Sequence, residues 1–218
     1  MKGTVLARTL LGLAVLMLIG ATALAADKST ITINGGRTTV QMKAPSKVVH
    51  NKIKPPANPF YDSVGTGYDM GVGYTTSDGS PIGTEYSPGI QFIALKSGTT
   101  KKVSVGLGWV EGTFKEGIVV LDKDCKGIPC GTIDKTNLCM GKVFNLPTFG
   151  STATTVRSFN CAVKLTKGKP YWVYVASTNN SWLAWNLAAT ALGGVIEGTN
   201  DVWGTPSSNS SVGAVRIN

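Results

Sequence analysis

The sequence has little histidine, a residue on which many catalytic and metal sites depend. Its 218 residues include a single histidine, His50. Histidine changes charge near neutral pH and is the commonest metal ligand. A Ser-His-Asp or Cys-His centre would have to recruit His50 from a proline-rich stretch. A zinc site would find it far from every cysteine. We therefore expect no catalytic residues of these classes and no zinc.

Long apolar runs are missing after the N-terminus. The first 26 residues have the parts of a signal peptide, namely positive Lys2 and Arg8, an apolar stretch at 10–19, and the small residues of "ATALAA". We expect cleavage after Ala25 or Ala26. Since no second apolar run follows, we predict export to the periplasm or the medium, with no membrane span once the signal is removed.

Arginine-rich stripes are also missing, although the chain carries a formal charge of +9. Loss of Lys2 and Arg8 with the signal lowers this charge from +9 to +7. The remaining lysines stand as singles and pairs, for example at Lys101, Lys102, Lys164, Lys167 and Lys169. This spacing is typical of a solvated surface, so we expect no nucleic-acid partner.

Helical periodicity is absent as well, and "WNLAATALGG" is the only candidate for a helical turn. Glycines and other turn residues instead recur about every 8 to 12 positions between short apolar runs, which is typical of antiparallel sandwiches and barrels. We predict an all-β fold, an antiparallel β-sandwich of jelly-roll-like form.

Three segments show the strand pattern most clearly. "KKVSVGLGWV" alternates large and small residues, which predicts one core-facing side. "GIVVLD" is apolar on both faces and predicts a central strand. "PYWVYVAS" places tyrosine and valines on one face and Trp172 with Tyr174 on the other. The residues expected to face the core in the first segment are Val103, Val105, Leu107 and Trp109.

The chain divides by composition into three parts. "TITINGGRTTVQM" reads as a short hairpin around Gly-Gly, and "KAPSKVVHNKIKPPANP" reads as an extended arm rich in proline and lysine. Removing 26 of the 218 residues leaves about 192, enough for one large domain with a core. We predict a signal peptide at 1–26, a hairpin and extended arm at 27–59, and the sandwich at 60–218.

The densest chemistry lies in "DKDCKGIPCG", residues 122–131. In an exported chain an even number of cysteines predicts disulfides, and four cysteines allow three pairings. We favour Cys125 with Cys130, because a Gly-Ile-Pro turn between them brings their α-carbons into bridging range, and Cys139 with Cys161. A redox pair is disfavoured, since four residues intervene and no helix follows.

The same stretch also resembles the start of a calcium loop. Asp122, Asp124 and Gly127 match an Asp-x-Asp-x-x-Gly pattern, in which alternate oxygens converge on a hard cation. However, Lys126 and Ile133 stand where such a loop needs oxygen ligands. We expect no cofactor, with calcium at Asp122 and Asp124 as the alternative.

Carboxylates and aromatics supply the remaining candidates. A glycosidase needs two carboxylates flanking a cleft, but Glu111 and Glu116 are five apart and would point to opposite faces of a regular strand. The best binding candidates are loop residues, Trp182 with Asn179 and Asn180, and Trp203, which together could form a surface for sugar rings. The other carboxylates considered for catalysis are Glu85, Glu197 and Asp201.

Six stretches from Phe60 onward form a characteristic series, namely "FYDSVGTGYDMGVGYTTSDGSPIG", "IQFIALKSGTTKKVSVGLGWVEGT", "GIVVLDKDCKGIPCGTI", "NLPTFGS", "LTKGKPYWVYVAS" and "WLAWNL". In this order they resemble the choice-of-anchor domains of exported bacterial proteins, most closely type R. That resemblance implies a β-sandwich displayed outside the cytoplasm, without an assigned reaction. The C-terminal "SSVGAVRIN" has no sorting signal, so we expect no anchor, and Cys125 with Cys130 look like a disulfide added to an existing turn of the family.

The sequence therefore leads to three functional hypotheses. The first is a non-catalytic exported module that binds a polysaccharide or another matrix component. The second is a cell-surface assembly protein whose arm, from Lys28 to Pro59, pairs onto a sheet edge of another surface protein. The third, which we place last, is a glycan-cleaving enzyme.

Overall fold

The fold is built from antiparallel strands joined by turns and loops. A computed structural model describes residues 29–34, 37–42, 57–79, 85–132, 135, 137–151, 153–178, 180–199 and 202–218, and no helix occurs among them. The all-β prediction is therefore confirmed. The strands are β1 (Ser29–Asn34), β2 (Arg37–Met42), β3 (Tyr61–Asp62), β4 (Tyr68–Asp78), β5 (Glu85–Ile93), β6 (Gly98–Thr99), β7 (Lys102–Gly112), β8 (Glu116–Lys123), β9 (Cys139–Phe144), β10 (Val156–Asn160), β11 (Lys164–Leu165), β12 (Pro170–Ser177), β13 (Ser181–Thr199), β14 (Val202–Trp203), β15 (Ser207–Gly213) and β16 (Val215–Ile217).

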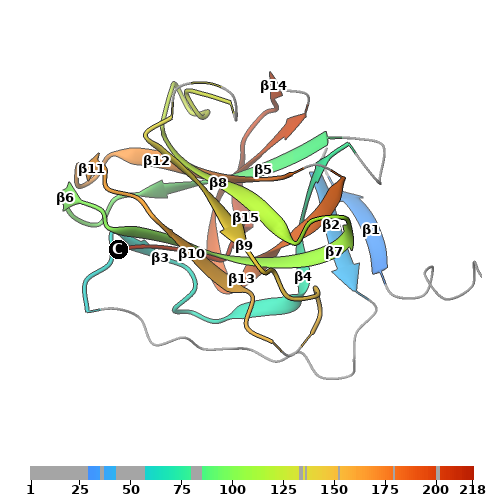
Figure 1. Ribbon diagram of the computed structural model, residues 1–218. Coiled ribbons are helices and arrows are strands. Elements are labelled where there is room, and N and C mark those ends of the chain that lie inside the picture. Colours follow the sequence, from blue (N-terminus) through green and yellow to red (C-terminus); the bar gives the residue numbers. More distant parts are fainter. Residues whose placement is uncertain are drawn as a thin grey trace, which may run out of the picture.

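The strands form a sandwich-like arrangement of two layers (Figure 1). One layer contains β5, β12, β8 and β9 as hydrogen-bonded neighbours, and the other contains β3, β16 and β7, with β10 also paired to β7. The long strand β13 joins them. Its first half pairs with β4 and β7, and its second half pairs with β5 at Val195↔Ile90. The predicted antiparallel sandwich is thus observed, with one strand shared between the layers.

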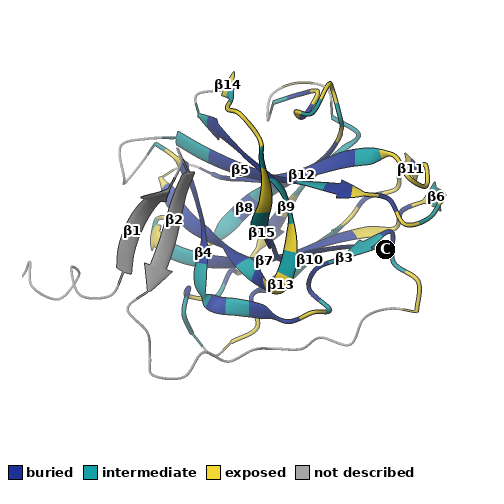
Figure 2. Cartoon of the chain, turned by 180° about the vertical axis from the view of Figure 1, so that it is seen from behind, coloured by how far each residue is buried: buried dark blue, intermediate teal, exposed yellow. Residues whose placement is uncertain are grey.

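The core lies between these layers and is lined by alternate residues of the strands, as the period-two pattern predicts. Val103, Val105 and Leu107 of β7 are fully buried, and Trp109 packs beside them at partial exposure. The strand β8 is central, between β12 and β9, as "GIVVLD" predicted. Figure 2 shows the buried colour running through the middle of these strands and the exposed colour gathering at the turns.

The outer face of β12 is also buried, which alternation alone did not predict. Trp172 and Tyr174 point away from the core that contains Val173, and both are fully buried. Residues on the segment after β8 bond to them, since Trp172 Nε1 donates to Asp124 and the Tyr174 hydroxyl donates to Asn137. The segment that carries both disulfide-forming residues Cys125 and Cys130 therefore covers this face of the sheet.

The predicted hairpin around Gly-Gly is present in the backbone. Strands β1 and β2 pair antiparallel from Ser29↔Met42 to Asn34↔Arg37, and β2 pairs with β4 over residues 39–41. The predicted signal peptide and most of the predicted arm lie outside the described residues. The one helical candidate, "WNLAATALGG", lies within β13, because pairing with β4 and β15 supplies its hydrogen bonds.

Candidate functional site

The stretch 122–131 folds as a tight hairpin closed by a disulfide. Lys126 and Gly127 both have positive φ, of 61° and 91°, as a two-residue turn with left-handed central residues requires. Cys125 N–H donates to the Ile128 carbonyl at 2.7 Å. The turn is therefore centred on Lys126 and Gly127 and not on the Gly-Ile-Pro expected from the sequence. Gly127 suits this position because glycine adopts positive φ without steric cost.

The predicted disulfide pairing is confirmed at both bridges. Cys125 and Cys130 are bonded across the hairpin with their α-carbons 4.8 Å apart. Cys139, at the start of β9, is bonded to Cys161, which follows β10, with the α-carbons 5.9 Å apart. Both separations lie in the range that a disulfide spans. The two bridges fit an oxidising environment.

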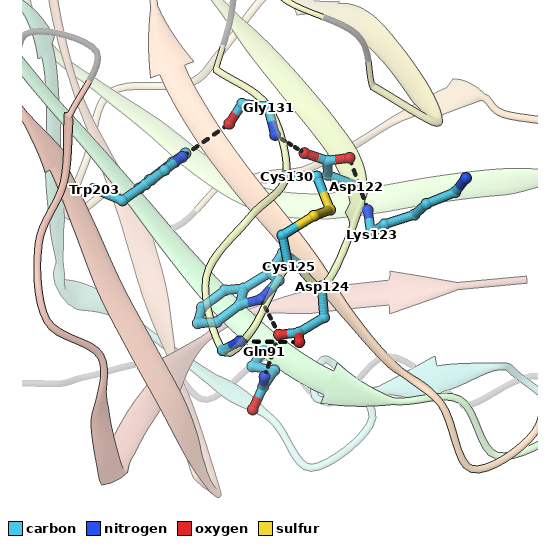
Figure 3. Close-up of a disulfide and its surroundings, with 10 residues drawn as sticks. Gln91, Asp122, Lys123, Asp124, Cys125, Cys130, Gly131 and Trp203 are labelled. Carbon is cyan, nitrogen blue, oxygen red and sulfur yellow. Dashed lines mark hydrogen bonds between the residues drawn. A yellow bond between two sulfur atoms is a disulfide. The ribbon is translucent and has the colours of Figure 1, made fainter.

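The two aspartates of this stretch hold it in place through N–H donors (Figure 3). Asp122 accepts the backbone N–H groups of Lys123 and Gly131, each at 2.7 Å. Asp124 accepts Gln91 Nε2 and Trp172 Nε1 on one oxygen, each at 2.7 Å, and the Gly127 N–H on the other at 3.0 Å. Every carboxylate oxygen that a calcium ion would need therefore already faces an N–H donor.

Asp122 is buried, with 2% of the residue exposed, so the charge of its carboxyl group is poorly solvated. Burial raises the pKa of this carboxyl above its ordinary value of 3.8, while the N–H groups of Gly131 and Lys123 oppose the shift. Desolvation is the larger effect. Asp122 thus acts as a buried acceptor that fixes the hairpin to the end of β8.

The predicted aromatic and amide set does not form one surface. Trp182 lies in β13, not in a loop, and is 7% exposed because it packs on Phe149, Ala184 and Val110. This corrects the expectation that Trp182 offers an exposed ring. Asn180 is exposed at the β12–β13 turn, where its N–H donates to Asp78 at 2.7 Å. Asn179 lies outside the described residues.

Trp203 is partly exposed, but its ring is held by three neighbours. Its Nε1 donates to the Gly131 carbonyl at 2.8 Å, and its ring meets Tyr174 edge-on with 4.9 Å between centroids. A side chain at Gly198 would meet its ring at 2.9 Å. Trp203 therefore clamps the disulfide hairpin to the outer face of the sheet.

A recess of about 230 Å³ lies beside this hairpin, where β12 begins. Its walls combine cationic and apolar side chains from four segments, namely the end of β8, the residue before β9, the strand β11, and the β11–β12 turn with the start of β12. The lining residues are Lys123, Asp124, Leu138, Lys164, Lys169, Pro170 and Tyr171.

The recess is positively charged. Its three lysines are exposed and form no ion pair with any described residue. Figure 3 shows the Lys123 side chain extending away from the disulfide. Asp124 is the carboxylate among the described lining residues. Its oxygens accept hydrogen bonds from Trp172, Gln91 and Gly127, so the carboxylate faces the protein interior.

The recess belongs to a wider lysine end of the sandwich, which we define by six exposed lysines. Strand pairing brings these lysines to one end. Lys164 pairs with Thr99 of β6, and Lys123 pairs with Tyr171 of β12. The Lys101 carbonyl accepts the Cys161 N–H. The strands β6 and β11 mark this end in Figures 1 and 2. The six are Lys101, Lys102, Lys123, Lys164, Lys167 and Lys169.

The opposite, acidic end carries carboxylates at the other tips of the same strands. The strand β7 begins at Lys102 and bears Glu111 next to its end, whereas β8 begins at Glu116 and ends at Lys123. Glu116 is paired with Lys142 at 3.3 Å and accepts the Thr178 hydroxyl. Asp78 and Glu85 form a cross-strand pair there, so four carboxylates mark this end.

The carboxylates considered for catalysis do not line the recess. Glu197 is buried at 9% exposure on β13, Glu85, Glu111 and Glu116 lie at the acidic end, and Asp201 is outside the described residues. Glycoside hydrolysis uses a carboxylate on each side of the scissile bond, and the described lining offers Asp124 alone. Chemically, the arrangement suits binding an anion against an apolar wall.

Comparison with family models, curated proteins and solved structures gives no match to this chain. The resemblance to the choice-of-anchor domains therefore stays a prediction. In the described part of the chain, no helix has the length and apolar character needed to cross a membrane.

The lysines of the recess are the residues that sequence reasoning passed over. Lysines scattered as singles and pairs are typical of a solvated surface, and these three stand 41 and 5 positions apart, at 123, 164 and 169. The signal that could have found them is the position of each lysine at the same end of an expected antiparallel strand.

Proposed function

We propose that this protein is an exported, non-catalytic β-sandwich that binds a polysaccharide of the cell surface or matrix at the lysine-lined recess. The observation that carries the proposal is the recess itself, in which three lysines that form no ion pair with described residues lie beside the apolar side chains of Leu138 and Pro170. Sugars present polar edges and apolar C–H faces, and such walls match both.

The size of the recess supports a polymer as the ligand. At about 230 Å³ it is smaller than the roughly 300–1,000 Å³ of sites that enclose a whole small molecule. A recess of this size takes one unit of a chain and leaves its neighbours outside. The surrounding loops are tied by two disulfides and by Trp203, so the surface is preorganised for binding.

Assembly through the N-terminal arm is the alternative, and the described backbone does not favour it. The strand β2 pairs with β4 of its own chain through Thr39, Val40 and Gln41. Pairing onto another protein would have to replace this contact. Deletion of the arm should therefore leave the oligomeric state unchanged in light scattering.

A polysaccharide panel, containing neutral and charged polymers, tests the proposed function by affinity electrophoresis. We expect retardation of the protein by at least one polymer, and weaker retardation of Lys164→Ala with Lys169→Ala. The matched control is Lys115→Ala with Lys142→Ala, which removes two lysines outside the recess. Failure to bind any polymer, or an equal loss in the control, contradicts the proposal.

A further inference from the structure

We infer that the ligand is an acidic polysaccharide, a uronic-acid polymer, and that it runs from the recess across the rest of the lysine end. This inference rests on the proposed function and names its ligand class. It assigns two contiguous subsites, the recess with Lys123, Lys164 and Lys169, and a second subsite with Lys101, Lys102 and Lys167.

The recess accounts for the first subsite. A uronate ring carries one carboxylate and an apolar C–H face, and the recess carries lysines beside the partly exposed apolar side chains of Leu138 and Pro170. The ammonium groups supply the counter-charge. Asp124 offsets these charges only in part, because both of its oxygens accept N–H groups from the protein side.

The second subsite continues the first across β11 and β6. Lys164 of β11 pairs with Thr99 of β6, and the chain from β6 leads directly to Lys101 and Lys102. The Lys167 N–H donates to Ser97 Oγ at 2.9 Å, which holds the β11–β12 turn against the segment before β6. Lys101, Lys102 and Lys167 are exposed and form no ion pair with described residues.

The chemistry of this end favours a uronate polymer over other polyanions. Single-stranded nucleic acids stack on exposed aromatic rings, but Tyr171 is 8% exposed and its ring stacks on Phe92. Bidentate phosphate recognition uses arginine, and Arg216, which lies opposite Ser104 of β7, is paired with Asp62 at 3.0 Å. Lysine ammonium groups match single carboxylates spaced along a chain.

A pair of matched polymers tests the inference with the full-length secreted protein. The probes are polygalacturonate and its fully methyl-esterified form, which differ in charge and share a backbone. We expect binding of the acid form to be at least about tenfold tighter than binding of the ester in 50 mM salt, and to weaken about tenfold or more by 0.5 M salt as the charges are screened.

Variants locate the ligand. Each exposed lysine contact should raise the affinity for polygalacturonate about two- to fivefold. Replacing Lys123, Lys164 and Lys169 together by alanine should therefore weaken binding about tenfold or more. Alanine at Lys101, Lys102 and Lys167 should weaken it by a similar factor. The matched control replaces two exposed lysines of the acidic end, Lys115 and Lys142, and should change affinity less than twofold.

The outcomes separate the inference from the proposed function. Equal binding of acid and ester overturns the inference and leaves a polysaccharide-binding protein. Tighter binding to inorganic polyphosphate, to single-stranded DNA or to phosphatidylglycerol vesicles than to polygalacturonate also overturns the inference. Binding to no polysaccharide, in this assay and in the panel, contradicts both.

Discussion

The two ends of the sandwich are built from the same strands but differ in charge and in cross-linking. At the lysine end, six exposed lysines lie beside both disulfides, since Cys130 N–H donates to the Lys123 carbonyl and Cys161 N–H to the Lys101 carbonyl. At the acidic end the lysines are engaged, Lys142 with Glu116 and Lys115 over the Trp109 ring.

This difference shows how an end with an excess of positive charge is kept folded. Like charges held close together repel, which costs free energy of folding. The loops of the lysine end are covalently closed, and the hairpin at 122–131 is further clamped by Trp203 and Trp172. The charges at this end are thereby left available to a ligand.

Removal of the larger disulfide should produce the largest change. Replacing Cys139 and Cys161 by serine opens a 23-residue loop, for which the chain-entropy model gives a loss of about 3.4 kcal/mol in the free energy of unfolding. Replacing Cys125 and Cys130 opens a six-residue loop and should cost about 2.2 kcal/mol. Urea unfolding measures both losses, and the reverse order would contradict this account of the cross-links.

Asp124→Asn should separate stability from binding. The amide loses the charge-assisted bond from the Gly127 N–H, so we expect a loss of about 1.5 kcal/mol in unfolding free energy. The recess also loses its carboxylate, so affinity for polygalacturonate should rise severalfold. Asp78→Asn is the matched control, since Asp78 accepts the Asn180 N–H at the acidic end. An equal rise in affinity there would count against a localised site.

Neutralising two lysines should stabilise the protein when no ligand is present. We expect Lys167→Gln with Lys169→Gln to raise the unfolding free energy by about 0.5 kcal/mol at low salt, with the gain vanishing near 1 M salt because the repulsion is screened. Lys142→Gln removes the ion pair with Glu116 and should lower stability slightly. Destabilisation by the first pair would show that those lysines do not repel their neighbours.

The pH dependence of stability should report the buried Asp122. Because burial raises its pKa above 3.8, the folded protein holds a proton that the unfolded chain has released between pH 3.8 and the raised value. The stabilisation that protonated Asp122 gives to the folded protein is fully present below pH 3.8 and is lost as the pH rises through the pKa of the folded state. Relative to Asp122→Asn, wild-type stability should therefore fall with rising pH across this window. A relative rise would mean that the N–H bonds outweigh desolvation.

The sequence was sufficient to predict the layers and the cross-links. Alternation marked the core face of β7, with Val103, Val105 and Leu107 all buried, and cysteine spacing predicted both disulfides. These features depend on local periodicity and on loop length, which can be derived from one segment at a time.

The candidate site could not be predicted in the same way. Trp182 follows polar residues in the sequence but is buried by Phe149, a residue that reaches it through the fold. Lys123, Lys164 and Lys169 are separated in the sequence and come together because the end of β8 and the starts of β11 and β12 lie on one side. Charge at a site depends on strand topology, which periodicity does not give.

Hydrogen–deuterium exchange on the polygalacturonate complex tests most directly the claim that the lysine end is the binding surface. The account predicts slower exchange at 93–102, 123–131 and 161–171, where the lysines and the disulfide hairpin lie, with the turns near 78, 113 and 180 unchanged. Slower exchange at those turns of the acidic end, with the lysine end unchanged, would contradict it.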